Sequence, residues 1–354
     1  MIVITGAAGF LGGSMVRHLN ESGRSDLVLV ADYPVMPVET CHGASLQGDG
    51  ASLQGLRYVE KIPRDCFFDW LALNLQKVDF IIHLGSEIDT LPADPTCFQE
   101  QILEFSQRLW SFAAMNRIPL LFAAESTEAK WHWTGHKWIE WGCGAGPAAP
   151  ANQLEKSIPA VQLVSTPQST MECRVAEAER LKRQFDPWVL KQRVMPPLWA
   201  GFAMPEVYGP HEERLGNAAS TVCQLFRQWQ KEGCMLIPFY EYSENTDREP
   251  LMDRIFVKDV ATVFTWFIHH LPASGFYFLG TGYPRPLSAV ATAIFSALKQ
   301  PVNVRYSTLP IPAVNLQQSE NQLVLSRLGT VGYKKKMTPL ETGIRLSVKT
   351  FLEK

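Results

Sequence analysis

The chain has 354 residues, of which 46% are hydrophobic and 19% charged, and its formal net charge at pH 7 is −2. This length suits one large domain or two closely joined domains, and the near-neutral charge predicts no binding of nucleic acid or of an anionic membrane. No apolar stretch is long enough to cross a bilayer, and the N-terminus lacks the basic region of a signal peptide. The seven cysteines are scattered without a CxxC pair, which predicts free thiols in a cytoplasmic protein and no metal site.

The chain begins with a short apolar segment, residues 1–5, that runs directly into glycines at positions 6, 9 and 12. This pattern predicts a parallel strand followed by the phosphate-binding turn of a dinucleotide-binding fold, although such a turn can also be purely structural. Gly6 would permit the tight turn, Gly9 would let the backbone approach a pyrophosphate, and Gly12 would let the next helix pack against the strand. A helix over 10–20 would direct its free N–H groups at the anion. The predicted cofactor-binding residues of this loop are Gly6, Gly9, Phe10, Leu11 and Gly12.

A second predicted strand, residues 27–31, ends directly before Asp32. This carboxylate lies about 20 residues beyond the last glycine, where an acidic side chain holds the ribose hydroxyls of a dinucleotide. A simple turn or helix cap is the alternative role for Asp32. The segment 33–39 contains no Lys or Arg that could pair with a 2′-phosphate, so the sequence favours NAD over NADP.

Strand-like and helical segments continue to alternate through the first half of the chain. Further strands are predicted at 79–84 and 119–124, and an apolar helix face is predicted over 99–115. The alternation implies βαβ units, and hence an α/β fold with a doubly wound parallel sheet of the Rossmann type. Residues 130–168 interrupt this rhythm with four tryptophans and a Gly/Ala/Pro-rich loop. We expect the tryptophans to form a core or subunit contact; the alternative is an exposed patch, for a partner, a sugar ring or a lid.

The second half is predicted to be mixed α/β. A long helix over 169–184 should end at Asp186-Pro187, followed by a strand over 188–193 and a Pro-rich turn. Further helices are expected at 218–232, 257–270, 287–299 and 339–352.

Five motifs resemble those of the extended short-chain dehydrogenase/reductase family, in its nucleotide-sugar epimerase and dehydratase branch. TGAAGFLG at 5–12 matches T-G-x-x-G-x-x-G, and DFIIHLGS at 79–86 resembles the fourth strand, D-x-x-x-H-x-A-A. EVYGPHE at 206–212 resembles the R-x-x-N-V-Y-G-P block, while FVKDVA at 256–261 and YFLGTG at 277–282 match V-x-D-V-A and N-x-G-x-G. Three further stretches are similar to the ADP-heptose 6-epimerase subfamily: FYEYSENTDRE at 239–249, MECRVAEAERLKRQ at 171–184 and PLETGIRLSVKTFL at 339–352.

The resemblance implies a nicotinamide cofactor, NAD or NADP, and a sugar-nucleotide substrate that is epimerised by transient oxidation to a ketone and return of the hydride. It implies a Rossmann domain at 1–203, which includes the insert at 130–168, and a smaller α/β substrate-binding domain at 204–354, from which 253–282 returns to the first. Members of the family commonly self-associate, so a homo-oligomer is compatible with the resemblance. It adds Leu84, Gly85, Ser86 and Val207 to the cofactor site, and Tyr240, Glu241 and Ser243 to the substrate site. For the last three, a polar β-turn is the alternative.

The catalytic Tyr-x-x-x-Lys pair of the family is missing from the sequence. None of the nine tyrosines is followed by Lys four residues later, and the helix match puts Thr170 at the tyrosine position and Arg174 at the lysine position. A threonine hydroxyl has a pKa far above the value of about 10 for tyrosine, so it needs another base near neutrality. Arginine keeps the positive charge and could hold a ribose or phosphate. Glu125 stands where the family has its serine, and Ser126 and Thr127 lie next to it.

Two interpretations of this altered set remain open. The chain is either a divergent enzyme with another base, for which Glu87, Glu125 and His132 are candidates, or a pseudo-epimerase that acts by binding. The catalytic residues are therefore unassigned. His83 is expected to be a hydrogen-bonded strand-end histidine rather than a catalyst.

The substrate block departs from the family as well. Glu206 replaces the substrate-contacting asparagine, and Met252 or Asp253 falls near an expected arginine. Arg248 and Arg254 are close enough in sequence to take the place of that arginine.

Overall fold

A computed structural model describes residues 1–31, 53–84, 99–124, 131–133, 138–140, 171–240, 249, 251–309 and 327–353. Its centre is a seven-stranded sheet with the order β3-β2-β1-β4-β5-β8-β13, in which every adjacent pair is parallel. The strands are β1 (Ile2–Thr5), β2 (Leu27–Ala31), β3 (Glu60–Pro63), β4 (Phe80–His83), β5 (Leu120–Ala124), β8 (Trp199–Ala203) and β13 (Gly275–Phe278). The strand order reverses at β1, so the predicted doubly wound α/β sheet is confirmed.

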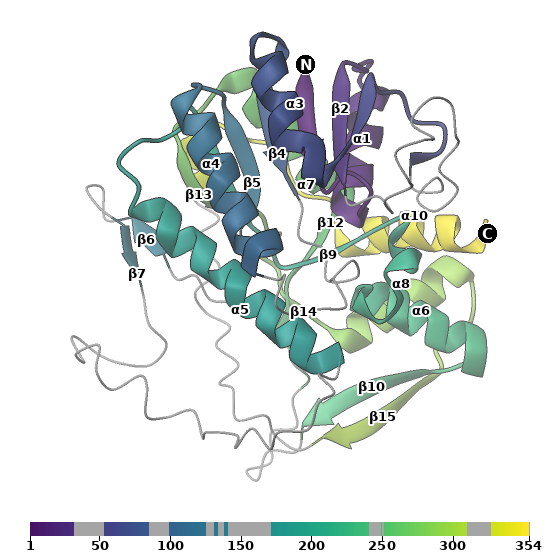
Figure 1. Cartoon of the computed structure of the whole chain (residues 1–354). Coiled ribbons are helices and arrows are strands. Elements are labelled where there is room, and N and C mark those ends of the chain that lie inside the picture. The colour runs from purple at the N-terminus through teal and green to yellow at the C-terminus, as the bar shows by residue number, and fades with distance from the viewer. Residues whose placement is uncertain are drawn as a thin grey trace.

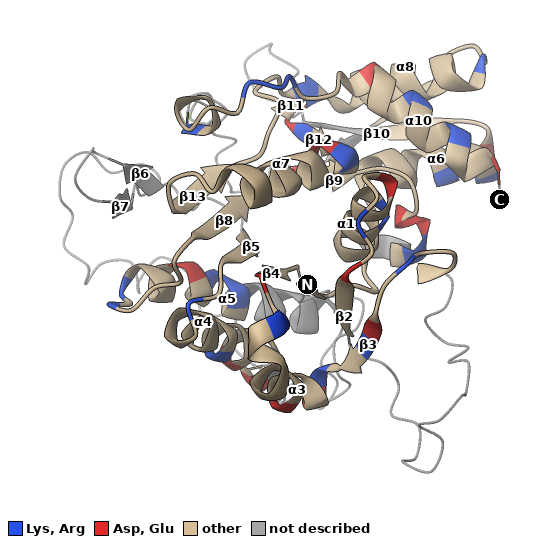
Figure 2. Cartoon of the chain, turned by 90° about the horizontal axis from the view of Figure 1, so that it is seen from above, with Lys and Arg blue, Asp and Glu red and all other residues tan. Residues whose placement is uncertain are grey.

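Helices cover both faces of this sheet (Figure 2). On one face lie α1 (Phe10–Glu21) and α7 (Val257–His270), and on the other lie α3 (Phe67–Asn74), α4 (Phe105–Met115) and α5 (Met171–Leu190). Successive residues of β1 point to opposite faces, because Ile2 and Ile4 pack in the core beneath α1 and α7, whereas Val3 packs beneath the other three helices. Burial on both faces explains why β1 and β2 are continuous apolar runs.

A second, smaller group of elements lies beyond the carboxyl ends of the strands (Figure 1). It has its own hydrophobic core, formed by α6 (Thr221–Glu232), α8 (Leu287–Leu298) and α10 (Leu340–Leu352), with the parallel pair β10 (Met235–Tyr240) and β15 (Val304–Leu309). Two short pairs connect it to the sheet: β9 (Glu206–Tyr208) with β12 (Arg254–Phe256), and β11 (Leu251–Met252) with β14 (Arg285–Pro286). The domain bounds that the resemblance implies stay a prediction.

The prediction for residues 169–193 is wrong in two respects. Helix α5 continues through Pro187 to Leu190, so no strand forms over 188–193, and the next strand is β8. Proline removes one helical hydrogen bond, but Phe185 and Val189 lie four residues apart on one face and are both buried against the sheet. Their burial outweighs the lost bond.

Other differences are smaller. The segment expected as one helix over 99–115 is π-helical in η6 (Gln99–Glu104) and becomes α-helical only in α4. The helix over 257–270 is confirmed, and α6 begins later than expected because Ser220 caps it by accepting the N–H of Cys223.

Of the tryptophan-rich insert, the structure describes one antiparallel backbone pair, β6 (Trp131–Trp133) with β7 (Trp138–Glu140). The rest of 130–168 lies outside the described residues. The role of the tryptophans, as a core, a partner surface or a lid, therefore stays a prediction. Within the described ranges, no helix combines the length and the apolar character needed to cross a membrane.

Candidate functional site

The loop between β1 and α1 requires glycine at two of the three predicted positions. Gly6 has a φ of +67°, in the left-handed region that L side chains rarely adopt. A Cβ on Gly12 would lie 2.1 Å from the carbonyl oxygen of Gly6 and 2.7 Å from the Cα of Ala7, so only glycine lets α1 approach the turn this closely. Gly9 differs, because its φ of −77° and ψ of 177° suit any residue. The missing side chain of Gly9 therefore has no explanation in the backbone conformation.

The N-terminus of α1 has no side-chain cap at Gly9 among the described residues. The first intrahelical bond runs from the N–H of Gly13 to the carbonyl of Gly9 at 2.8 Å, so the N–H groups of Phe10, Leu11 and Gly12 precede it. N–H groups ahead of the first intrahelical bond, a positive helix end and a position without a side chain together fit the diphosphate of a dinucleotide.

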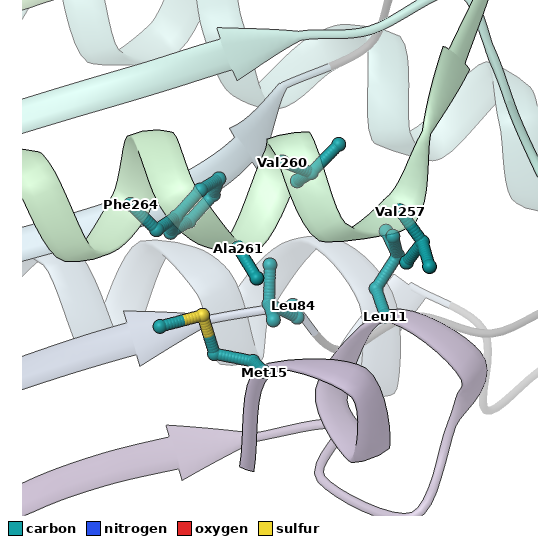
Figure 3. A pocket seen from close by; sticks show the side chains of 7 residues that line it. All are labelled: Leu11, Met15, Leu84, Val257, Val260, Ala261 and Phe264. Atoms are coloured by element: carbon teal, nitrogen blue, oxygen red, sulfur yellow. The ribbon is translucent and has the colours of Figure 1, made fainter. Parts of the chain in front are cut away.

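Two of the predicted cofactor-binding residues meet beside this loop, although they come from different elements. Leu11 of α1 and Leu84, directly after β4, line one apolar notch with side chains of α7 (Figure 3). This notch is too small for a nucleotide or a sugar, so it is packing rather than a ligand pocket. Val207 of β9 packs against the same hydrophobic cluster. The contacts of these residues with a cofactor stay a prediction.

Several predicted site residues lie outside the described part of the chain. These are Asp32, Gly85, Ser86, Glu87, Glu125, Ser126, Thr127, Thr170, Glu241, Ser243 and Arg248. Tyr240, His132 and Arg174 lie in β10, β6 and α5, of which only the backbone is described at these positions.

His83 is hydrogen-bonded through both ring nitrogens, as predicted for a strand-end histidine. Its Nδ1 lies 2.6 Å from the hydroxyl of Thr5 and its Nε2 lies 2.9 Å from the hydroxyl of Ser106. Burial, together with the charges of Arg64 and Lys182, lowers the pKa of His83 to about 3. A ring that stays neutral and has both nitrogens engaged is poorly suited to be the missing catalytic base.

Glu206, which stands at the position of the family's asparagine, forms an ion pair with Arg254. The two residues are directly opposite in the β9–β12 register, and the Nε of Arg254 lies 2.7 Å from the Oε2 of Glu206. Glu206 also accepts the N–H of Thr221 at 2.8 Å and its hydroxyl at 2.6 Å. The guanidinium of Arg254 is therefore neutralised by Glu206, which weakens the expectation that it replaces the missing arginine.

Two further carboxylates have hydrogen-bonding roles that the sequence did not assign to them. Glu212 is fully buried and accepts the N–H groups of Gly209 at 3.1 Å and Ser220 at 2.8 Å; burial raises the pKa of this side chain to about 7, against the opposing effect of these hydrogen bonds. Asp253 accepts the N–H groups of Thr281 at 2.8 Å and Gly282 at 2.9 Å, which fixes the turn of the YFLGTG motif. The motif itself was the signal for that turn. No group of residues within the described ranges could hold a metal ion.

Comparisons with known proteins agree with the fold. The chain matches no family model. It is 25% identical to the ADP-L-glycero-D-manno-heptose-6-epimerase of Fusobacterium nucleatum over 363 residues, which cover 100% of this chain and 98% of that protein. The enzyme of the same name from Nitratidesulfovibrio vulgaris is 24% identical over 354 residues, covering 99% of this chain and 98% of that one.

Solved structures give the same result for the fold. The ADP-L-glycero-D-manno-heptose-6-epimerase of Helicobacter pylori has a TM-score of 0.64 at 18% identity and covers 98% of this chain and 94% of its own. A UDP-glucose 4-epimerase of Thermus thermophilus, solved with NAD, has a TM-score of 0.62 at 18% identity and covers 99% of this chain and 98% of its own. The predicted resemblance to extended short-chain dehydrogenase/reductases of the epimerase and dehydratase branch is thereby confirmed, and the chain is similar over its full length to the ADP-heptose 6-epimerases.

Proposed function

We propose that this protein binds NAD(P) at the loop of residues 5–12 and a sugar nucleotide beside it, and that it acts as a nucleotide-sugar epimerase. The loop geometry carries the proposal. Gly6 and Gly12 are required for the turn itself, whereas Gly9 leaves a helix N-terminus without a side-chain cap, for which a diphosphate gives a physical reason. The full-length similarity to epimerases supports the same function.

The nicotinamide cofactor would supply hydride transfer, so that a hydroxyl-bearing carbon of the sugar is oxidised to a ketone and then reduced on its other face. The chain must supply a base for the hydroxyl proton and donors to the oxygen. Arg174 replaces the lysine and can hold a ribose or phosphate. Because a threonine at position 170 cannot act alone, the base should be a carboxylate or imidazole, with Glu87, Glu125 and His132 as the candidates.

ADP-heptose is the first substrate to test, because the relatives named above carry ADP-L-glycero-D-manno-heptose-6-epimerase as their name. NAD is the preferred cofactor because Asp32, directly after β2, would oppose a 2′-phosphate. An Asp32→Ala variant should then bind NADP better relative to NAD than the wild type does. Equal preference in both proteins would remove the role assigned to Asp32.

The decisive binding experiment uses the variant Gly9→Asp. Aspartate suits the extended backbone conformation of Gly9 and is a good N-cap, but Gly9 is buried, so the Tm is measured first to verify that the variant folds. Its carboxylate would face the diphosphate, so calorimetry should show NAD affinity reduced about 100-fold or more, which corresponds to about 2.8 kcal/mol. Gly9→Ser, a neutral cap, is the matched control and should bind more tightly than Gly9→Asp. Unchanged NAD affinity in Gly9→Asp would refute the assignment of the loop.

The catalytic experiment follows inversion at C-6 of ADP-heptose by NMR in the wild-type protein. Turnover that disappears in Gly9→Asp supports the epimerase. Bound NAD without turnover of ADP-heptose or of a panel of UDP- and dTDP-sugars would instead identify a pseudo-epimerase.

A further inference from the structure

Three buried polar side chains form a continuous hydrogen-bond chain at the carboxyl edge of the sheet. Thr5, His83 and Ser106 are 2%, 5% and 6% exposed, and they belong to β1, β4 and α4. The hydroxyl of Ser106 donates to the carbonyl of Ile102 at 2.8 Å, so its oxygen accepts from His83 at 2.9 Å. This fixes the proton on Nε2 and leaves Nδ1 to accept from the hydroxyl of Thr5 at 2.6 Å. Every donor in the chain then points the same way, from β1 to η6.

The two ends of this hydrogen-bond chain lie at functionally important places. Thr5 is the last residue of β1 and directly precedes Gly6, where the left-handed turn of the cofactor loop begins. Ile102 lies in the π-helical segment η6, which packs against α5, the helix that carries Arg174. Segments of π-helix are rare and are often found at functional sites.

We propose that His83 is a positioning residue, which through Thr5 and Ser106 holds the cofactor loop in register with η6 and α4 and thereby sets the affinity for NAD(P). The inference rests on the proposed function of the loop. Burying polar side chains costs free energy unless each of them finds a hydrogen-bond partner, whereas an apolar contact has no such requirement. The presence of this chain between hydrophobic layers therefore requires a reason beyond packing. The burial that lowers the pKa of His83 keeps the ring neutral, so it acts as a rigid spacer whose tautomer does not change near neutral pH.

The test is to break the chain at the end remote from the cofactor. Ser106→Ala removes a hydroxyl on α4, and we expect it to raise the Kd for NAD about fivefold. Ser111→Ala is the matched control, because Ser111 makes the same bond to the carbonyl four residues earlier, at 2.8 Å to Gln107, on the same helix. The control should leave the Kd unchanged.

A double-variant cycle separates coupling from simple destabilisation. Thr5→Val should weaken NAD binding to a similar extent, and Thr5→Val/Ser106→Ala should be no weaker than the worse single variant, because both changes interrupt one chain. Thr5→Ser restores the hydroxyl and should restore binding. Hydrogen exchange of the amides of residues 6–12, measured without cofactor, should be faster in Ser106→Ala than in Ser111→Ala.

The outcomes are distinguishable. If the wild type binds NAD and Ser106→Ala binds it equally well with unchanged loop exchange, His83 has only a structural role and the inference is overturned, while the proposed function stands. If the wild type binds neither NAD nor NADP, both are overturned.

Discussion

The carboxylate of Glu206 and the guanidinium of Arg254 face each other across the short β9–β12 pair, 2.7 Å apart, at the carboxyl edge of the sheet. Arg254 is almost fully buried, with 2% of its side chain exposed, and its Nη1 also donates to the carbonyls of Met252 and Arg285. The pair joins the strand that carries Val207 to the strand that leads into α7. It thus links β9, which follows the sheet strand β8, to the start of α7.

Removing one partner of this pair should be costly. Glu206→Ala leaves a buried guanidinium without its counter-ion, and we expect the free energy of unfolding to fall by about 3 kcal/mol in urea titrations. The double variant Glu206→Gln/Arg254→Met should lose less stability than the sum of the losses in its two single variants. The matched control is the exposed pair Arg285–Glu341, 3.0 Å apart, where Glu341→Ala should cost less than about 1 kcal/mol. Equal losses of stability in Glu206→Ala and Glu341→Ala would show that burial does not make the Glu206–Arg254 pair more important than an exposed one.

Gly12→Ala tests the close approach of α1 to the cofactor loop. The new Cβ would meet only backbone atoms, so no side-chain rotation relieves the contact, and we expect destabilisation of about 3 kcal/mol together with loss of NAD binding. Gly23→Ala, at the other end of α1, is the control. Because Gly23 has a φ of +85°, alanine there should lower the free energy of unfolding by about 1 kcal/mol. No atom lies within 4 Å of the new Cβ, so NAD binding should be retained. A stable Gly12→Ala that binds NAD would show that the loop tolerates a wider turn.

Gly343→Ala tests how α10 packs on the segment that follows Val207. Alanine normally stabilises a helix relative to glycine by about 1 kcal/mol, but here its Cβ would lie 2.1 Å from the hydroxyl oxygen of the fully buried Tyr208. We therefore expect a lower Tm, and partial recovery in Gly343→Ala/Tyr208→Phe. Gly329→Ala is the control, since its Cβ meets nothing within 4 Å, and it should not lower the Tm. If the Tm of the double variant does not recover, the loss of stability arises from the backbone of α10 instead.

These sites also show what the sequence could and could not predict. The β1–loop–α1 unit was predictable because buried parallel strands are continuous apolar runs and because the turn needs glycine for local steric reasons. Strand β3 was not, because it lies at the sheet edge and only Ile62 of its residues is buried. The extension of α5 past Pro187 was missed because tertiary burial overrode a local rule.

The candidate site was likewise predictable only in part. The glycine roles are local and could be deduced, whereas the partner of Glu206 lies 48 residues away and depends on the β9–β12 register, which no local pattern encodes. The hydrogen bonds of His83 likewise join three elements. The hydroxyls that engage both ring nitrogens come from residues distant in the sequence, and only the apolar strand around His83 indicated that such partners were needed.

The buried His83 should make the protein sensitive to acid. Its pKa in the folded state is about 3, below the ordinary value of 6.5, because burial and the charges of Arg64 and Lys182 oppose protonation. The unfolded chain therefore binds the proton first as the pH falls below about 6.5. The stabilisation is fully present above that pH and is lost progressively toward pH 3, at about 1.4 kcal/mol for each pH unit in which only the unfolded state is protonated.

Urea midpoints at pH 7 and pH 4.5 measure this effect. His83→Asn, which is neutral at both values and can still accept from Thr5, should lose less stability on acidification than the wild type does. Glu212 titrates in the opposite direction, since its raised pKa of about 7 favours the folded state at low pH, but its contribution is common to both proteins and cancels in the difference. His269→Asn, at an exposed position in the last turn of α7, should follow the wild type. If His83→Asn and the wild type lose equal stability, the proton does not discriminate between the folded and unfolded states at His83, and the ring cannot be the fixed neutral spacer between Thr5 and Ser106.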